Sequence, residues 1–432
     1  MELAILFLVL FVLLAIRVPI GFAIGGATIV VITAFGGVDM SVMAKYSFTG
    51  LNSFSLLAIP FFILAGGIMG AGGIAKRIID IADKAVGFIT GGLGMVLTVG
   101  SMFFAALSGS AMATVSAIGG MLIPEMKRKN YDQAYSATLA SFAGTIGIII
   151  PPSIPLVVYG CCTQTSVGDL FIAGIMPGIL LGVSFMVVNY IYCRKNKLGG
   201  KFDPEYVPVP FGQAAKELLI ALKNGFWALL APVIILGSIY AGICTPTEAA
   251  VIAVVYSLAV SVFIYKEMNM KQLYKCFVDA VVINGITVYI VGVSSAFANY
   301  LTQAQVPGKV CELLLGISDS KIVILLIINI FLLILGCFMD NIPATLILAP
   351  ILLPAVEQLG MHPVHFGVML TLNLAIGLVT PPYGANLFVG AAVAKVKMGD
   401  MMRHIIPLLI ASIVTLMLVT YVPFFTMGFL GG

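Results

Sequence analysis

Apolar runs close to twenty residues long recur from one end of the sequence to the other. A run of that length, wound as an α-helix, crosses a bilayer core of about 30 Å. The composition agrees, because 61% of the 432 residues are hydrophobic and only 9% are charged, whereas about 25% of a soluble protein is charged. The sequence predicts an all-α polytopic membrane protein, and it excludes a soluble enzyme, a nucleic-acid-binding protein and a disordered chain.

Ten segments are predicted to cross the membrane. They are 3–16, 18–35, 47–69, 132–160, 169–193, 226–243, 247–265, 276–304, 364–394 and 404–428. Two further apolar stretches, 86–124 and 320–357, are each long enough to enter the membrane and return on the same side. Both have small or polar residues at their centre, where a turn would fall. We therefore interpret these two stretches as re-entrant helical hairpins.

The basic residues predict the orientation, because cytoplasmic loops are enriched in Lys and Arg. The loop at 194–223 is rich in them and is placed in the cytoplasm. If both hairpins return on the side they entered, every one of the 22 Lys and Arg residues, Arg17 included, faces the cytoplasm except Lys45, Lys309 and Lys321. This sorting supports both hairpins and places the N-terminus outside.

The two halves of the sequence resemble each other at a constant offset of 230 positions. Pro151-Pro152 matches Pro381-Pro382, and Gly147 matches Gly377. The first hairpin starts and ends in the cytoplasm and the second starts and ends outside, so the repeats are inverted. Inverted repeats with interrupted helices are typical of secondary transporters, whose sites lie near the midplane where the repeats meet. No nucleotide-binding loop is present, so ATP is not expected to drive transport.

The expected domain organisation follows from the repeat. A first inverted repeat at 1–200 contains the hairpin 86–124 and a broken helix at 132–160. A cytoplasmic amphipathic linker helix is expected within 201–225, where several proline residues are followed by a stretch of charged and apolar side chains. The second inverted repeat, 226–432, contains the hairpin 320–357 and a broken helix at 364–394.

The hairpin centres are the first candidate site. Ser108-Gly109-Ser110 lies midway along 86–124, and Asp340-Asn341 lies midway along 320–357. A carboxylate and an amide inside an apolar run are costly unless they serve a function. Two structural alternatives stay open: a helix-packing face of small residues at the first centre, and a simple helix cap at the second.

The Pro-Pro pairs are the second candidate site. Adjacent prolines remove two backbone donors and leave the preceding carbonyls free. These carbonyls, together with the hydroxyls of Ser108 and Thr380, are hard oxygen ligands that suit Na⁺. The half-helix after each pair begins with free N–H groups and a positive dipole end, which suit a carboxylate. The structural alternative is a pair of proline kinks.

These motifs carry a resemblance to a known family. The chain resembles the large membrane subunit of TRAP transporters, the tripartite ATP-independent periplasmic family, over nearly its whole length. The most specific motifs are Arg17-Val18-Pro19-Ile20-Gly21, Leu56-Leu57-Ala58-Ile59-Pro60-Phe61-Phe62, Ser108-Gly109-Ser110, Ile150-Pro151-Pro152-Ser153, Thr245-Pro246-Thr247-Glu248-Ala249-Ala250 and Thr380-Pro381-Pro382. The stretch 153–178 looks most like the sialic-acid branch.

The resemblance implies a mechanism and a set of partners. It implies an elevator-type transporter of the bacterial inner membrane that imports an organic acid, with sialic acid as the best guess. It also implies coupling to Na⁺ at two or more sites, a small four-helix membrane subunit and a periplasmic substrate-binding protein. The Na⁺ sites carried over from the family are Ser108, Gly147, Ile150 and Pro152 in one half, and Gly336, Asp340, Gly377, Thr380 and Pro382 in the other. The substrate site carried over is Ser110, Ser153 and Asn341.

Two other functions are weighed. A stand-alone Na⁺/dicarboxylate symporter of similar inverted-repeat design would transport without a binding protein. An intramembrane enzyme with Ser108 as nucleophile is disfavoured, because no His lies at a comparable predicted depth to act as its base.

Overall fold

The computed structural model describes residues 2–16, 18–36, 39–202, 210–318, 320–382 and 384–430. Within these ranges the secondary structure is helical and no strand occurs. Six helices are long and apolar enough to cross a membrane, and the pair α12 and α13, bent by 62°, can count as a seventh. The predicted all-α polytopic membrane fold is therefore confirmed.

The helices follow one another in two runs of similar length. The first run contains α1 (Glu2–Ala15), α2 (Ile20–Phe35), α3 (Met40–Thr49), η1 (Phe54–Leu57), α4 (Ala58–Ala71), α5 (Ile74–Val86), α6 (Gly92–Ser108), α7 (Ala111–Thr114), η2 (Val115–Gly119), α8 (Gly120–Arg128), α9 (Gln133–Thr145), η3 (Ile146–Ile148), α10 (Ile154–Thr163) and α11 (Val167–Asn196). The second contains η4 (Gly200–Phe202), α12 (Phe211–Asn224), α13 (Phe226–Tyr240), α14 (Pro246–Ala259), η5 (Val260–Ile264), α15 (Met270–Gln303), α16 (Val306–Ile317), α17 (Lys321–Gly336), α18 (Asn341–Gln358), α19 (Pro363–Gly377), α20 (Ala385–Ala394), α21 (Met398–Tyr421) and α22 (Phe424–Met427).

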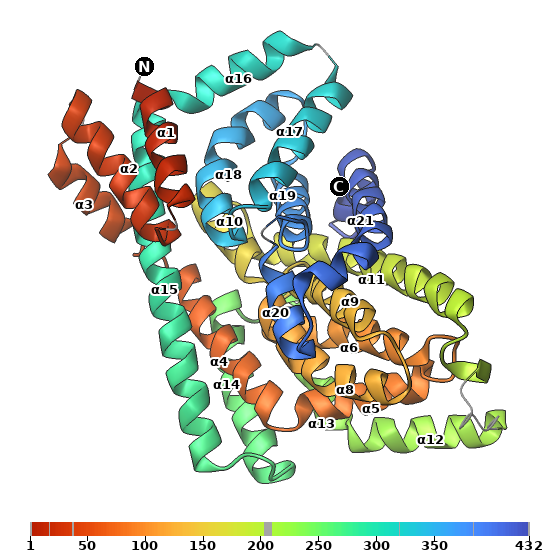
Figure 1. Cartoon of the computed structure of the whole chain (residues 1–432). Helices are drawn as coiled ribbons and strands as arrows, with labels where there is room; N and C mark the ends of the chain where they lie inside the picture. Colours follow the sequence, from red (N-terminus) through yellow and green to blue (C-terminus); the bar gives the residue numbers. More distant parts are fainter. Residues whose placement is uncertain are drawn as a thin grey trace.

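Helix α15 is the long element along one side of the molecule, and it contacts α2, α3, α4 and α18. Its 34 residues extend about 51 Å at 1.5 Å per residue. Figure 1 shows α1, α2 and α3 beside its upper part, and α4 and α14 beside its lower part. The expected crossings at 3–16 and 18–35 correspond to α1 and α2, whose 14 and 16 residues are shorter than a full span.

Three short helices, α3, α5 and α16, were not predicted from the sequence. The expected crossing 47–69 is divided, because α3 ends at Thr49 and the continuous helix begins at Phe54. Helix α5 lies where a basic loop was expected, and it buries Ile74, Ile78 and Ile81 on one face. Figure 1 shows α5 and α12 along the lower edge of the molecule and α16 along its upper edge.

Helix α12 (Phe211–Asn224) lies within the linker expected at 201–225. Lys84 of α5 forms an ion pair with Glu217 of α12 at 3.2 Å. Helix α14 begins with a capping box: the Thr245 hydroxyl accepts a hydrogen bond from the Glu248 N–H, and the Glu248 carboxylate accepts one from the Thr245 N–H. Arg17 and residues 203–209 of the linker lie outside the described residues.

The two broken helices occupy the centre of the molecule. Every residue of α9 from Ala134 to Thr145 is buried, and so is every residue of α19 from Val364 to Gly377. Figure 1 shows both helices enclosed by their neighbours. Asp132 caps α9 and binds Arg403 of α21 at 2.7 Å.

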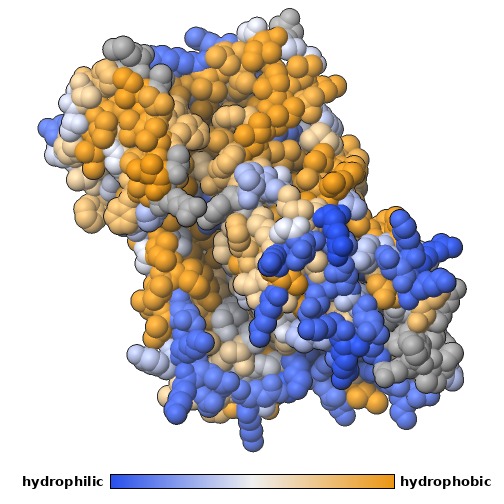
Figure 2. Space-filling view, in the orientation of Figure 1, coloured by the Kyte–Doolittle hydropathy of each residue, from blue (hydrophilic) through white to orange (hydrophobic). Residues whose placement is uncertain are grey.

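Hydrophilic side chains gather at one end of the molecule. Figure 2 shows them over the lower end, where α5, α8 and α12 lie in Figure 1, while most of the upper surface is hydrophobic. This distribution agrees with the cytoplasmic face predicted from the basic residues.

The orientation can be tested by cysteine labelling. In a variant without the seven native cysteines, single cysteines at Lys129 and Lys197 should react only with reagents that reach the cytoplasm. Cysteines at Lys45 and Lys309 should react with membrane-impermeant maleimide in intact cells. Labelling of Lys129 and Lys197 from opposite sides would contradict the inverted topology.

Candidate functional site

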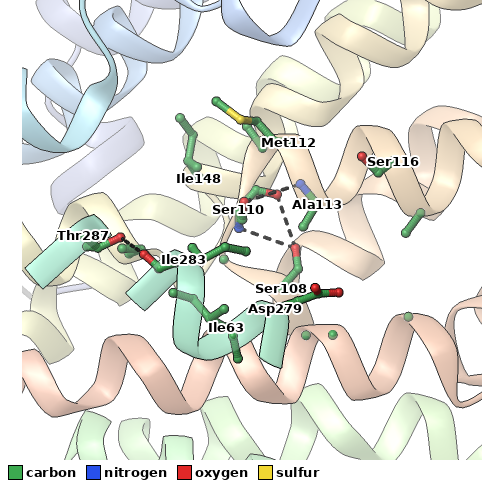
Figure 3. A pocket seen from close by; sticks show the side chains of 18 of the residues that line it. Ile63, Ser108, Ser110, Met112, Ala113, Ser116, Ile148, Asp279, Ile283 and Thr287 are labelled. Atoms are coloured by element: carbon green, nitrogen blue, oxygen red, sulfur yellow. Dashed lines mark hydrogen bonds between the residues drawn. The ribbon is translucent and has the colours of Figure 1, made fainter. Parts of the chain in front are cut away.

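A cavity of about 1050 Å³ lies between two groups of helices. Helices α4 and α15 form one wall, and the turns of both hairpins and the start of α10 form the other. Figure 3 shows Ser108, Ser110 and Met112 of the first hairpin facing Ile283 and Thr287 of α15. The lining continues along α15 to Gln272 and Lys275, near the lower end of that helix.

The first hairpin turns at Gly109, which has φ +61° between α6 and α7. The Ser108 hydroxyl lies 3.0 Å from the Thr114 hydroxyl, which donates to the Ser110 carbonyl at 2.8 Å. Ser110 caps the next helix by accepting from the Ala113 N–H at 3.4 Å. The turn is therefore a compact set of oxygen atoms.

The second hairpin turns between α17 and α18. Asp340 is the N-cap of α18, as the structural alternative expected, and its carboxylate accepts from the Asn341 N–H at 2.8 Å. Asp340 is exposed to the cavity, whereas Asn341 is 2% exposed. The Asn341 amide donates to the Thr371 carbonyl at 3.4 Å, and its oxygen accepts from the Thr345 hydroxyl at 3.2 Å. Asn341 thus fastens the turn to α19.

The first Pro-Pro segment packs directly on the first hairpin turn. A Cβ on Gly147 would lie 2.6 Å from the Thr114 hydroxyl and 2.8 Å from the Ser110 carbonyl. A Cβ on Gly109 would lie 2.7 Å from the Pro152 carbonyl. Two of the residues expected in the first Na⁺ site, Gly147 and Pro152, are therefore placed against the turn that holds Ser108.

The second Pro-Pro segment packs on the second hairpin in the same manner. Gly336 and Gly377 are in direct backbone contact, with no room for a Cβ on Gly377. The Thr380 hydroxyl donates to the Ile376 carbonyl at 2.7 Å. The peptide bonds Pro151-Pro152 and Pro381-Pro382 are both cis.

The predicted site residues divide into those that line the cavity and those behind its wall. Ser108, Ser110, Asp340 and Asn341 line it. The others lie outside the lining: Gly147, Ile150, Pro152, Ser153, Gly336, Gly377, Thr380 and Pro382. Ser153 is fully buried and caps α10, with its hydroxyl donating to the Ile148 carbonyl at 2.6 Å. Its part in binding substrate remains a prediction.

Sequence reasoning missed three buried polar residues beside these turns. The Thr114 hydroxyl belongs to the group of oxygen atoms at the first turn. Thr114 lies four residues after Ser110, one helical turn further on, and this spacing could have predicted the contact. The hydroxyl oxygen of Thr371 and the amide oxygen of Asn386 are buried with no hydrogen-bond partner among the described residues. Asn386 otherwise donates to the Ser141 carbonyl at 3.3 Å and joins α20 to α9.

The oxygen atoms at both turns suit Na⁺. They are hydroxyl, carboxylate, amide and carbonyl oxygens, which hard cations prefer. Among the described residues no group of three His, Cys, Asp or Glu side chains could hold a transition metal.

Three helix N-termini converge on the cavity. Ser110 to Ala113 begin the helix after the first turn, Ile154 and Pro155 begin α10, and Asp340 to Ile342 begin α18. Each N-terminus carries the positive end of a helix dipole, although in α10 the Ile154 and Leu156 N–H groups are already bonded to the Gly109 carbonyl and the Ser153 hydroxyl. Among the described lining residues, Lys275 is the one basic side chain. Asp279 and Asp340 are the acidic lining side chains, so it is the helix N-termini and Lys275 that suit an anionic ligand.

The sequence matches a known family over almost its full length. Residues 7–425 match the family described as "Tripartite ATP-independent periplasmic transporter, DctM component". The chain is 44% identical over 370 residues to the C4-dicarboxylate TRAP transporter large permease protein DctM of Pseudomonas aeruginosa, with 86% of this chain and 84% of that protein covered. It is 35% identical over 415 residues to the sialic acid TRAP transporter large permease protein SiaM of Vibrio cholerae, with 96% and 95% covered.

A third relative is longer than this chain. The isethionate TRAP transporter permease protein DctMQ of Oleidesulfovibrio alaskensis is 41% identical over 418 residues, which cover 97% of this chain but 65% of that protein. Among solved structures, the YdaH transporter of Alcanivorax borkumensis shares the fold with a TM-score of 0.59, at 13% identity and with 91% of this chain and 90% of that one covered.

The chain belongs to the DctM family of TRAP transporter large permeases. It is a multi-pass protein of the bacterial inner membrane and a transport protein, not an enzyme. The resemblance drawn from the motifs is thereby confirmed at the level of the family.

Close contact between the two cavity walls gives a testable prediction. A Cβ on Gly66 of α4 would lie 3.0 Å from the Ser108 Cα, whereas one on the adjacent Gly67 would lie 3.9 Å from the Cys276 Cβ. Gly66→Ala should crowd the first turn at a cost of about 1–3 kcal/mol and slow substrate uptake several-fold, while Gly67→Ala stays near wild type. Initial uptake rates, normalised to protein in the membrane, measure this. Equal rates for the two variants would show that the turn tolerates the added methyl group.

Proposed function

We propose that this chain is the large permease subunit of a Na⁺-coupled TRAP system that imports an organic acid. A periplasmic binding protein delivers the acid, and a small four-helix membrane subunit completes the transporter. The family name supports the tripartite assembly. The observation that carries the proposal is the cavity at which three helix N-termini meet beside two oxygen-lined turns.

The cavity is suited to acids of more than one shape. Its lining is largely apolar, and its polar groups gather at the turns and near Lys275. The relatives are named for a C4-dicarboxylate, isethionate and sialic acid, all of which carry an acidic group. Sialic acid, expected from the stretch 153–178, remains a candidate, and identity to the dicarboxylate permease is higher, at 44% against 35%.

Coupling to Na⁺ is proposed from the oxygen groups in the cavity wall and directly behind it. Ser108, with the carbonyls near Gly147, Ile150 and Pro152, would hold one ion. Asp340 and Thr380, with the carbonyls near Gly336, Gly377 and Pro382, would hold a second. The support is that Gly147 and Pro152 pack on the first turn, and that Gly377 packs on Gly336 of the second hairpin.

An elevator mechanism is proposed from the way the cavity is divided. Its walls belong to two sets of helices, one with α4 and α15 and the other with the hairpins and broken helices. Movement of the second set along the first would carry a ligand across the membrane. Gly66 and Gly70 of α4 lack side chains and lie against Ser108 and Phe104 of the first hairpin, so they offer a smooth surface for such movement.

Reconstitution tests the function directly. Proteoliposomes that contain the chain and its small subunit should accumulate one of three radiolabelled acids, namely a C4-dicarboxylate, isethionate or sialic acid. Accumulation should require both an inward Na⁺ gradient and the cognate binding protein. Uptake by the chain alone, without binding protein, would favour the stand-alone Na⁺/dicarboxylate symporter. Uptake that is unchanged when K⁺ replaces Na⁺ would contradict Na⁺ coupling.

Asp340 is expected to act through Na⁺ and not through the substrate. A carboxylate within the membrane needs a cation partner, and the N-terminus of α18 supplies only a partial charge. Asp340→Asn should weaken Na⁺ binding by about 1–3 kcal/mol. Because coupling is reciprocal, substrate affinity should fall at low Na⁺ and recover at high Na⁺.

The measurement is uptake against Na⁺ concentration for the wild type, Asp340→Asn and a control, Asp169→Asn. Asp169 lies exposed in the first turn of α11 and outside the cavity lining, so its variant should keep the wild-type half-saturation. If Asp340→Asn keeps it too and changes only the choice of substrate, Asp340 belongs to the substrate site.

A further inference from the structure

A second, smaller cavity lies away from the transport site. It measures about 460 Å³ and is formed where α5, the α12–α13 corner and the end of η5 meet. Three of its lining side chains are basic and one is acidic. The lining residues are Lys76, Arg77, Asp80, Lys223, Asn224, Trp227, Ile264 and Tyr265.

The position of this cavity corresponds to the edge of the bilayer. Helix α12 runs along the lower edge of the molecule, and the chain then turns by 62° into the apolar helix α13 at Phe226. The apolar segment formed by α14 and η5 ends on the other side of the cavity, at Ile264. Two membrane-buried segments thus begin or end at this level, which is where lipid head groups lie.

The side chains next to the cavity divide into a polar and an apolar part. Phe226, Phe263 and Ile264 are 53%, 75% and 42% exposed, so they present an apolar surface on the membrane side. Lys76 and Lys223 are exposed on the polar side. Trp227 is 40% exposed between the two parts, as is typical of tryptophan at a membrane interface.

Arg77 is held in a fixed position at the base of the cavity. Its guanidinium forms an ion pair with Glu267 at 2.7 Å and lies 3.7 Å from the centre of the Tyr265 ring. Tyr265 in turn accepts a hydrogen bond from the Ala228 N–H at 3.1 Å, which ties it to the start of α13. The guanidinium therefore needs little rearrangement to bind an anion, and the three basic groups outnumber the carboxylates of Asp80 and Glu267.

We infer that this cavity binds the phosphate of an anionic phospholipid, with Lys76, Arg77 and Lys223 around the head group and the acyl chains along Phe226, Phe263 and Ile264. Basic pockets between membrane helices on the cytoplasmic side are suited to such head groups. The acyl-chain surface beside the basic groups favours a lipid over a free phosphate ion. A lipid in this position would brace α5 against the corner of α12 and α13.

The sequence contains a single tryptophan, Trp227, so its fluorescence reports on this cavity without any label. The full chain is reconstituted in phosphatidylcholine vesicles that contain brominated phosphatidylglycerol or, in a parallel series, brominated phosphatidylcholine. Bromine quenches tryptophan only on contact. Brominated phosphatidylglycerol should quench Trp227 at a several-fold lower mole fraction, and this preference should shrink as salt is raised.

Variants separate the basic cavity from the overall charge of the protein. Lys76→Gln with Lys223→Gln should remove most of this several-fold preference, because both lysines attract the anionic head group. The matched control, Lys127→Gln with Lys216→Gln, removes the same charge from exposed residues outside the lining and should keep the preference. Lys76→Arg with Lys223→Arg should also keep it. An unchanged Trp227 emission maximum and gel-filtration profile establish that each variant is folded.

Three outcomes would overturn the inference. Equal quenching by the two brominated lipids would show that no anionic lipid is selected. Equal loss in the Lys76/Lys223 variant and in the Lys127/Lys216 control would show that only net charge matters. Relief of quenching by millimolar inorganic phosphate would show that the cavity binds free phosphate and not a lipid.

Discussion

The apolar membrane interior is the constraint on which the rest of this structure depends. A backbone that leaves helical geometry there must find its hydrogen-bond partners within the protein. At the first Pro-Pro segment the Ser153 hydroxyl bonds the Ile148 carbonyl, and the Ile154 N–H lies 3.5 Å from the Gly109 carbonyl. Each interruption is therefore stabilised by the hairpin beside it. The hairpins and the broken helices therefore pack as one unit, so a substitution in one of them is expected to shift the other.

The second half meets the same constraint with different side chains. The Asn386 N–H bonds the Leu378 carbonyl at 3.0 Å across the second interruption. Asn373 of α19 donates to the carbonyl and the amide oxygen of Asn329 in α17, at 3.0 and 2.7 Å. Amide side chains thus connect the second hairpin to its broken helix, whereas in the first half the contact is between backbone groups of Ile154 and Gly109.

Much of the fold follows from the sequence because hydropathy and charge act at long range in a membrane. The apolar runs located the spans, and the Pro-Pro pairs with Ser108-Gly109-Ser110 located the interruptions. The lateral helix α5 was missed because Lys76, Arg77 and Asp80 made it look like a loop, although Ile74, Ile78 and Ile81 have helical spacing. Amphipathic helices at a membrane edge bury only one face, so mean hydropathy does not reveal them.

The site itself was only partly predictable, for a different reason. Sequence patterns identify which residues break a helix, but packing decides which of them face a cavity. Ser110 and Ser153 both follow a break and both cap a new helix, yet Ser110 lines the cavity and Ser153 is fully buried beneath it. Thr371 and Asn386 lie within apolar helices that carry no local signal of a site. Their unpartnered oxygens become visible only when α19 and α20 are packed against their neighbours.

In the proposed site, one set of groups binds the acidic group and another distinguishes the rest of the ligand. This separation explains how one fold can bind different acids. Helix N-termini recognise negative charge through backbone N–H groups, and this recognition does not depend on the rest of the ligand. Discrimination must then come from side chains elsewhere on the wall, such as Met112, Ile283 and Lys275. Because these lie on both sets of helices, a ligand that fits holds the two walls at a particular spacing. Substrate choice and movement of the hairpins are therefore expected to be linked through the same contacts.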